Sequence, residues 1–171
     1  MRPMSTIRRW HFDQLRNALK TVFYIVQTGA KNDFTTYREN GDGWTAAEVI
    51  GHLLDCERLF LERARLTVTY DNPDLPFPDQ DEEVIRGRYN ERDLQAILAD
   101  WQHVRDEYLA YLSTVPEDAW EREGRHPRVA PFSLNDQLFL ICWHDTIHIE
   151  QITRILTEKK LAEEQGIMDK G

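Results

Sequence analysis

Residues 142–152 of the chain read Cys-Trp-His-Asp-Thr-Ile-His-Ile-Glu-Gln-Ile. Apolar residues recur around this stretch at the spacing of a helix that buries one face, at Leu138, Ile141, Ile152 and Ile155. His144 and His148 lie four residues apart within that stripe, so they project side by side from successive turns. Imidazoles are unfavourable to bury unless something coordinates or hydrogen-bonds them. A divalent metal explains the pair most economically; the alternatives are a surface-pointing pair and a pair hydrogen-bonded in the core.

Length and charge limit the classes of protein to consider. With 171 residues, 41% of them hydrophobic, the chain can bury one core, and we expect residues 1–171 to form a single domain. Its 21 basic and 30 acidic residues give a net charge of −9, so no basic stripe is available for nucleic acid or an anionic membrane. No apolar run has the length of a membrane span or a secretion signal. Cys56 and Cys142 lie in apolar helical patterns, which favours reduced thiols and a cytoplasmic location.

The hydrophobic periodicity predicts four amphipathic helices and no strand. Their approximate bounds are residues 6–27, 45–68, 90–114 and 133–158. Thr45 and Glu48 have the spacing of a capping box at the start of the second helix, and Ser133 can cap the fourth. With no internal repeat, this order of elements predicts an all-α fold, a four-helix bundle with one or more crossover connections.

The connection between the second and third helices is long. Residues 69–90 contain three prolines and an acidic run at 79–83, and they show neither a helical nor a strand period, so we expect a structureless segment. A helix of about 22 residues is about 33 Å long, and a connection of about 20 residues can span that distance. The second and third helices can therefore run parallel. The acidic run is most simply a solvated linker, and it could also lie over one end of the bundle.

A third histidine, His52, lies on the apolar face of the second predicted helix. Two histidines from one helix and one from another would make a face of three nitrogens. Three protein ligands leave a fourth position for water or substrate, as in catalytic zinc sites. Imidazole ligands suit zinc, nickel, copper or iron, so the residues alone do not choose the metal. The alternative is a core histidine hydrogen-bonded to a backbone group or a tyrosine.

Two neighbours of these histidines are candidates for contact with a ligand or substrate. Cys56 follows His52 by four residues on the same face, where it could be a fourth ligand, a reactive thiol or a small buried hydrophobe. Gln151 follows His148 by three residues and could orient a ligand, contact substrate or cap the core. The residues identify no general base.

The paired histidines also nearly match the H-E-x-x-H pattern of metalloproteases. Asp145 stands where that pattern has its glutamate base, and aspartate is shorter by one methylene. The charged tail offers only poor candidates for the downstream third ligand, and no strands are predicted. The sequence therefore argues against a metalloprotease.

The stretch from Trp44 to Asp55, which reads Trp-Thr-Ala-Ala-Glu-Val-Ile-Gly-His-Leu-Leu-Asp, and the stretch 144–152 together resemble the DinB/YfiT-like superfamily. The similarity covers essentially the whole chain. The resemblance implies an up-down-down-up four-helix bundle with a long crossover. It also implies a homodimer and a divalent metal held by His52, His144 and His148, with zinc or nickel favoured and iron possible.

The resemblance is less definite about chemistry. The resemblance implies one of two kinds of enzyme. The first is a metal-dependent transferase or isomerase that uses a low-molecular-weight thiol such as bacillithiol, mycothiol or glutathione, and the second is a hydrolase. Both fit a metal site, because a metal lowers the pKa of a coordinated thiol or water. The expected partner is a small-molecule substrate, possibly such a thiol. A non-catalytic, stress-associated metal-binding bundle is the alternative, and an interaction module without metal comes third.

Overall fold

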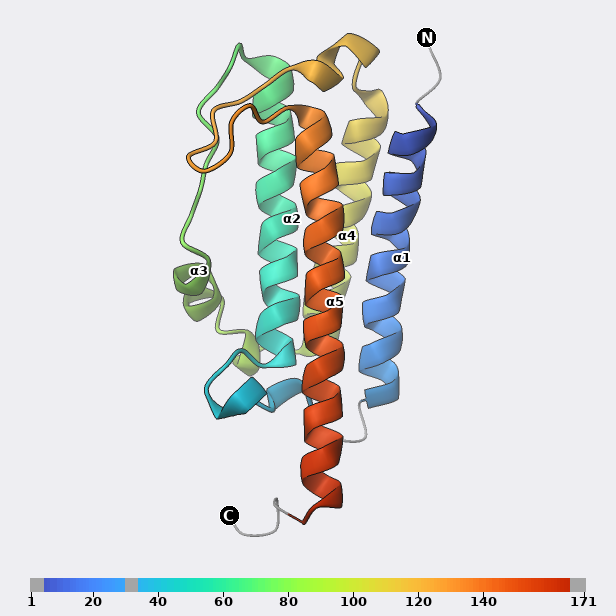
Figure 1. Cartoon of the computed structure of the whole chain (residues 1–171), viewed down its shortest axis with the longest axis vertical. Helices are drawn as coiled ribbons and strands as arrows, with labels where there is room; N and C mark the ends of the chain where they lie inside the picture. The colour runs from blue at the N-terminus through green and yellow to red at the C-terminus, as the bar shows by residue number, and fades with distance from the viewer. Residues whose placement is uncertain (1–4, 30–33, 167–171) are drawn as a thin grey trace.

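The computed structural model describes residues 5–29 and 34–166, and within these ranges the regular structure is helical with no β-strand. The long helices lie side by side as a bundle (Figure 1), and there are four of them in the described residues. These are α1 (Thr6–Gly29), α2 (Ala46–Thr69), α4 (Leu94–Thr114) and α5 (Leu134–Glu164). The connections hold a short helix, α3 (Gln80–Gly87), and the 3-10 turns η2 (Phe34–Thr36), η3 (Glu39–Gly41), η4 (Tyr89–Glu91) and η5 (Glu117–Glu121). None of the described helices is long and apolar enough to cross a bilayer.

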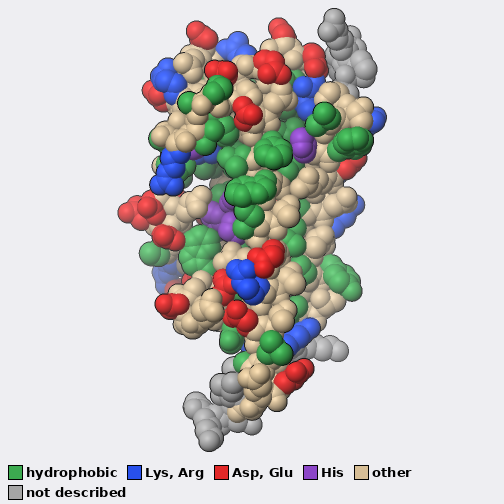
Figure 2. All heavy atoms as spheres, viewed as in Figure 1, with side chains coloured by type: hydrophobic (Ala, Val, Ile, Leu, Met, Phe, Trp, Pro, Cys, Tyr) green, Lys and Arg blue, Asp and Glu red, His purple; other side chains and the backbone are tan. Residues whose placement is uncertain are grey.

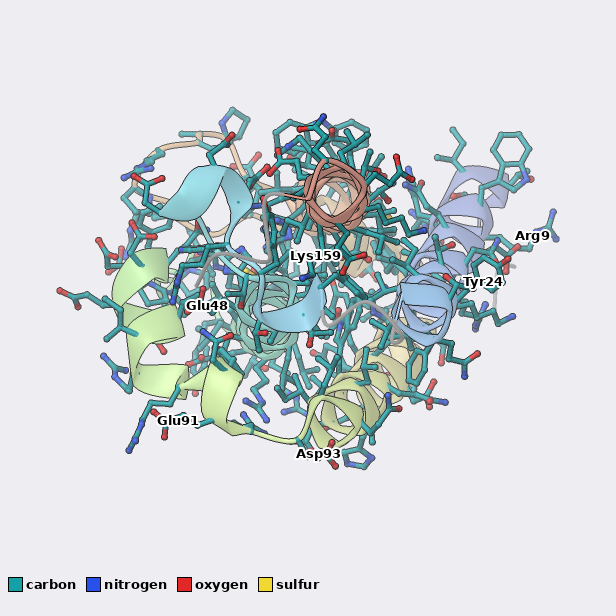
Figure 3. All side chains as sticks on the ribbon, turned by 90° about the horizontal axis from the view of Figure 1, so that it is seen from below. Arg9, Tyr24, Glu48, Glu91, Asp93 and Lys159 are labelled. Carbon is teal, nitrogen blue, oxygen red and sulfur yellow. The ribbon has the colours of Figure 1, made fainter. Side chains whose placement is uncertain are left out.

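The four long helices have the predicted up-down-down-up order. α1 and α5 run in one direction and α2 and α4 in the other, so α2 and α4 are parallel (Figure 1). Figure 3 looks along the bundle from the end at which α2 and α4 begin, near Glu48 and Asp93. α2 packs against both α4 and α5, and α1 packs against the other side of the same two helices. The predicted fold class is confirmed.

Side-chain caps begin the long helices much as the sequence predicts. The Thr45 hydroxyl accepts from the Glu48 amide at 3.1 Å, and the Glu48 carboxylate accepts from the Thr45 amide at 2.9 Å. Ser133 forms the same kind of reciprocal cap on α5. The start of α4 differs from the prediction, because its cap is Asp93. Asn90 instead lies in η4 and bonds to the side chains that cap α2. The end of α5 is also later than predicted.

The prediction of a structureless segment at residues 69–90 is wrong. The Asp79 side chain accepts from the amides of Asp81 and Glu82, which caps α3. Carboxylates in a first turn are stabilised by the positive end of the helix dipole, so the acidic run begins a helix. This helix buries only Val84, which explains why no helical period is visible in the sequence. Figure 1 places α3 along the side of α2, not over an end of the bundle.

Tyr89 fastens this connection to α2. A Cβ at Gly51 would lie 2.2 Å from atoms of the Tyr89 ring, so the ring can lie on the helix only because residue 51 has no side chain. The Tyr89 hydroxyl also donates to the carboxylate of Asp55. The end of the connection is therefore held one helical turn from His52, beside the predicted site.

A buried arginine joins all four long helices. The Arg105 guanidinium, on α4, donates to Glu57 of α2 at 2.8 Å, to Asp145 of α5 at 2.9 Å and to the Leu15 carbonyl of α1 at 2.7 Å. Arg105, Glu57 and Asp145 are each no more than 1% exposed. Trp101 adds a fourth side chain, since its indole N–H donates to Glu57 at 3.3 Å.

The charges of this cluster depend on one another. Burial raises the pKa of Glu57 and of Asp145, and the nearby guanidinium opposes that rise. For Arg105, burial alone would lower the pKa, but the two carboxylates raise it above its ordinary value. Removing one partner from such a buried set leaves uncompensated charge, which destabilises proteins by about 3–5 kcal/mol.

We expect Arg105→Met to lower the free energy of unfolding by about 3–5 kcal/mol, because two carboxylates would remain buried without their cation. The matched control is Arg65→Met. Arg65 also pairs α2 with α4, through Glu107 at 2.6 Å, but both side chains are about half exposed, and exposed pairs contribute about 0–1 kcal/mol. Urea unfolding followed by circular dichroism measures both losses. Equal losses in the two variants would contradict a central role for Arg105.

Candidate metal centre

Three histidine side chains meet between α2 and α5. His52 lies about two turns into α2, and His144 and His148 occupy successive turns of α5. The Nε2 atom of His144 is 3.0 Å from that of His52 and 3.2 Å from that of His148. The structure thus brings together all three histidines that the sequence singled out.

Hydrogen bonding among the rings does not account for this arrangement. A nitrogen of a neutral imidazole carries either a proton or a lone pair, so His144 Nε2 can bond to only one of its two neighbours. The other ring nitrogen of His144, Nδ1, is buried and has no hydrogen-bond partner among the described residues. His52 contacts the rings of His144, His148 and Trp44 and the thiol of Cys56, and among the described residues it bonds to no backbone group or tyrosine.

The three imidazoles are held in the form that binds metals. Burial, reinforced by charge on the neighbouring histidines, lowers the pKa of His52 to about 3 and that of His144 to about 2. Burial also lowers the pKa of His148, although its bond to Gln151 opposes the shift. At neutral pH the rings are therefore neutral, with lone pairs available to a cation.

Gln151 fixes the orientation of His148. Its Oε1 lies 2.8 Å from His148 Nδ1, and because an amide oxygen can only accept, Nδ1 carries the proton and Nε2 keeps its lone pair. Gln151 is held in turn by Glu39 of η3, which accepts from its amide at 3.1 Å, and Glu39 also pairs with Arg154. Support of this kind behind a ligand is typical of metal-binding histidines.

Cys56 places a sulfur beside the same nitrogens. Its Sγ is 3.5 Å from His52 Nε2 and 3.7 Å from His144 Nε2. The ligand atoms of His52, Cys56 and His144 all lie within 4.8 Å of one another, so these three residues, without His148, form a group that could hold a metal. Burial raises the pKa of the Cys56 thiol to about 12, so the thiol is protonated at neutral pH unless a cation is near.

The donor set fits a divalent cation. Nitrogens bound at about 2.0–2.1 Å to one ion, at tetrahedral angles, lie about 3.4 Å apart. The two separations from His144 Nε2, 3.0 Å to His52 and 3.2 Å to His148, are close to that value. Neutral imidazoles, with or without a thiol, suit zinc and the neighbouring transition metals.

A cavity of about 490 Å³ opens on this centre between α2 and residues 76–83. His52 and Cys56 lie at its inner wall, and Phe77 and Glu83 belong to the connection that covers it. Figure 2 shows histidine side chains at the surface near the middle of the molecule, next to hydrophobic ones. The connection that the sequence predicts to be a linker thus forms one wall of a pocket beside the histidines.

Several residues around the centre could not be found from the sequence. Glu39 holds Gln151, and Arg154 pairs with Glu39. Both are ordinary charged residues in the sequence, and they lie 115 positions apart. Trp44 precedes a cap, and its ring lies 5.0 Å from that of His52. Asp145 occupies the position of the protease base in the H-E-x-x-H pattern, and its carboxylate accepts a hydrogen bond from Arg105 in the interior.

The fold and the site together place this protein in a class. It is a helical bundle with a candidate metal centre, made of imidazoles between two helices and lying beside a cavity. The family model described as the DinB superfamily matches residues 11–152, and the chain belongs to this superfamily. The matched range includes all three histidines.

Curated relatives have similar lengths and a common name. The chain is 26% identical to a protein of Oceanobacillus iheyensis over 155 residues, which cover 90% of this chain and 87% of that protein. It is 28% identical to YfiT of Bacillus subtilis over 132 residues, 76% of this chain and 72% of YfiT. Both relatives are named "Putative metal-dependent hydrolase".

A solved structure of Bacillus subtilis YfiT has the same fold. It superposes with a TM-score of 0.79, covers 97% of this chain and 92% of its own, and is 22% identical in sequence. That structure is described as a probable metal-dependent hydrolase with an unusual four-helix bundle topology. The likeness supports the order of the four long helices found here.

We expect Gln151→Ala to weaken zinc binding about 10–100-fold, because His148 would lose the partner that fixes its tautomer and orientation. Competition with a chromophoric chelator measures the dissociation constant. The control is Gln137→Ala, which removes a buried glutamine of α5 that bonds to Thr67 instead. Equal affinities in the two variants would show that Gln151 does not orient a ligand.

Proposed function

We propose that His52, His144 and His148 bind a divalent cation and that the protein is a metal-dependent enzyme acting on a small molecule. The observation that carries the proposal is that His144 Nε2 lies 3.0 Å from His52 Nε2 and 3.2 Å from His148 Nε2, next to a cavity that His52 lines. A divalent cation bound there would lower the pKa of a coordinated water or thiol. We propose zinc or nickel as the metal, with iron possible, because imidazole ligands suit all three.

Hydrolysis is the first candidate reaction, because the curated relatives carry that name. Transfer of a low-molecular-weight thiol is the second, and one feature of the cavity favours it. Arg58, Glu62 and Glu83 all line the cavity, while Leu59 and Phe77 add apolar surface. A small thiol that carries both an amino and a carboxylate group would find opposite charges at this opening.

The residues of the chain would have separate tasks. His148 is oriented by Gln151, so that its Nε2 lone pair meets the cation. The covering segment at residues 76–83 limits access to one side, and Phe77 would help to exclude water from a bound substrate.

Metal content and turnover test this function together. Elemental mass spectrometry of protein purified without a metal-affinity tag should give close to one divalent metal per chain. The double variant His144→Ala, His148→Ala should lose that metal, while His103→Ala, an exposed histidine of α4, should keep it. Esters, amides and thiol–electrophile pairs are screened as substrates of the metal-loaded protein, and chelation should abolish the turnover of any that react. Metal that is absent after anaerobic reconstitution with zinc, nickel and iron would overturn the proposal.

A non-catalytic metal-binding bundle is the second candidate function. The sulfur of Cys56 favours it, because four protein donors make a closed site of the structural kind. That function predicts stoichiometric metal without turnover and a large fall in melting temperature on chelation.

We also propose that the protein is a homodimer. Phe139, Trp143 and Ile147 lie on one face of α5 and are 60%, 54% and 39% exposed. Figure 2 shows hydrophobic side chains gathered on the face of the molecule where α5 runs. Contiguous exposed apolar surface of this kind is typical of an interaction site.

We expect Trp143→Lys to convert the dimer to a monomer, because a charge would be buried against the apolar partner face. Size-exclusion chromatography with light scattering gives the mass. Ile85→Lys is the control, since Ile85 is 75% exposed on α3, outside the proposed interface. A monomeric wild-type protein, or a dimeric Trp143→Lys variant, would contradict the proposed interface.

A further inference from the structure

The thiol of Cys56 is surrounded differently from that of Cys142. Cys142 Sγ donates to the backbone carbonyl of His11 at 3.6 Å, a common arrangement for a buried cysteine. Cys56 Sγ instead lies near imidazole nitrogens of His52 and His144, at 3.5 to 3.8 Å, and the residue is 6% exposed. Packing as a small hydrophobe does not require a sulfur to face nitrogen lone pairs.

The distances from Cys56 to His52 and to His144 match those of a shared ion. A sulfur at about 2.3 Å and a nitrogen at about 2.0–2.1 Å from one zinc ion, at a tetrahedral angle, lie about 3.6 Å apart. The two observed distances from Cys56 Sγ to histidine Nε2 atoms are 3.5 and 3.7 Å. The backbone also favours this placement, because residues four apart on a helix project from successive turns of one face.

We infer that Cys56 is a fourth protein ligand, a thiolate that binds the same cation as His52, His144 and His148. This inference rests on the metal binding of the proposed function and adds a ligand to it. Coordination forms one sulfur–metal bond and breaks one S–H bond, and the proton passes to solvent. No oxidant or reductant takes part.

A fourth protein ligand changes how a substrate reaches the metal. Three histidines and one cysteine fill a tetrahedral site, and a site with four protein ligands is closed. Cys56 and His52 both line the cavity, so a donor group that enters there meets the thiolate at the metal. Such a group must displace Cys56 or bind as a fifth ligand. Cys56 would therefore control access to the centre.

Cobalt(II) substitution tests the inference through a spectroscopic signal. A thiolate ligand gives cobalt(II) an intense sulfur-to-metal charge-transfer band in the near ultraviolet, which imidazole ligands do not give. Cobalt-loaded wild-type protein and the Cys142→Ser variant should both show the band. Cys56→Ser should lose the band while still binding cobalt. Its affinity for cobalt should fall at least as much as on loss of a residue that supports a ligand, which is about 10–100-fold. A band that persists in Cys56→Ser would overturn the inference.

X-ray absorption on zinc-loaded Cys142→Ser protein tests the inference without altering Cys56. One sulfur at about 2.3 Å from zinc is expected, with the remaining scattering from nitrogen or oxygen. A first shell of nitrogen and oxygen alone would overturn the role of Cys56 and leave the three-histidine proposal standing. Failure of the wild-type protein to bind either metal would overturn both, so the two failures are distinguishable.

Discussion

The bundle depends on Arg105, which contacts α1, α2 and α5 from its position on α4. A buried ion cluster is stable only when every charge keeps its partner, so a shift of α2 or α5 along its axis would leave a buried charge unpaired. The two acidic partners are also neighbours of the candidate metal centre in sequence: Glu57 follows Cys56, and Asp145 follows His144. The contact that sets the relative height of α2 and α5 therefore also places the donors of α2 opposite those of α5.

Two supports complete the centre. Tyr89 lies on Gly51 and bonds to Asp55, which holds the connection that walls the cavity. Glu39 holds Gln151 behind His148. Both supports come from segments outside the four long helices, so the bundle supplies the donors while the connections orient them and shape access.

The sequence predicts the four long helices and the approach of the three histidines to one another, because both depend on a periodicity that a single chain displays. It does not predict Arg105, since a charged residue next to Val104 is indistinguishable from a solvated one until its partners on other helices are known. The short helix α3 buries only Val84, so it leaves no repeating pattern. Cys56 is ambiguous in the sequence because a ligand and a small hydrophobe occupy the same helical position. The distances from its sulfur to the ring nitrogens favour the ligand.

We propose that the relative height of α2 and α5 creates one metal site from donors on both helices. Anomalous diffraction at the zinc edge, on crystals of zinc-loaded protein, tests it most directly. We expect a single strong peak at about 2.0–2.1 Å from the Nε2 atoms of His52, His144 and His148. A peak elsewhere in the molecule, or none between these two helices, would contradict it.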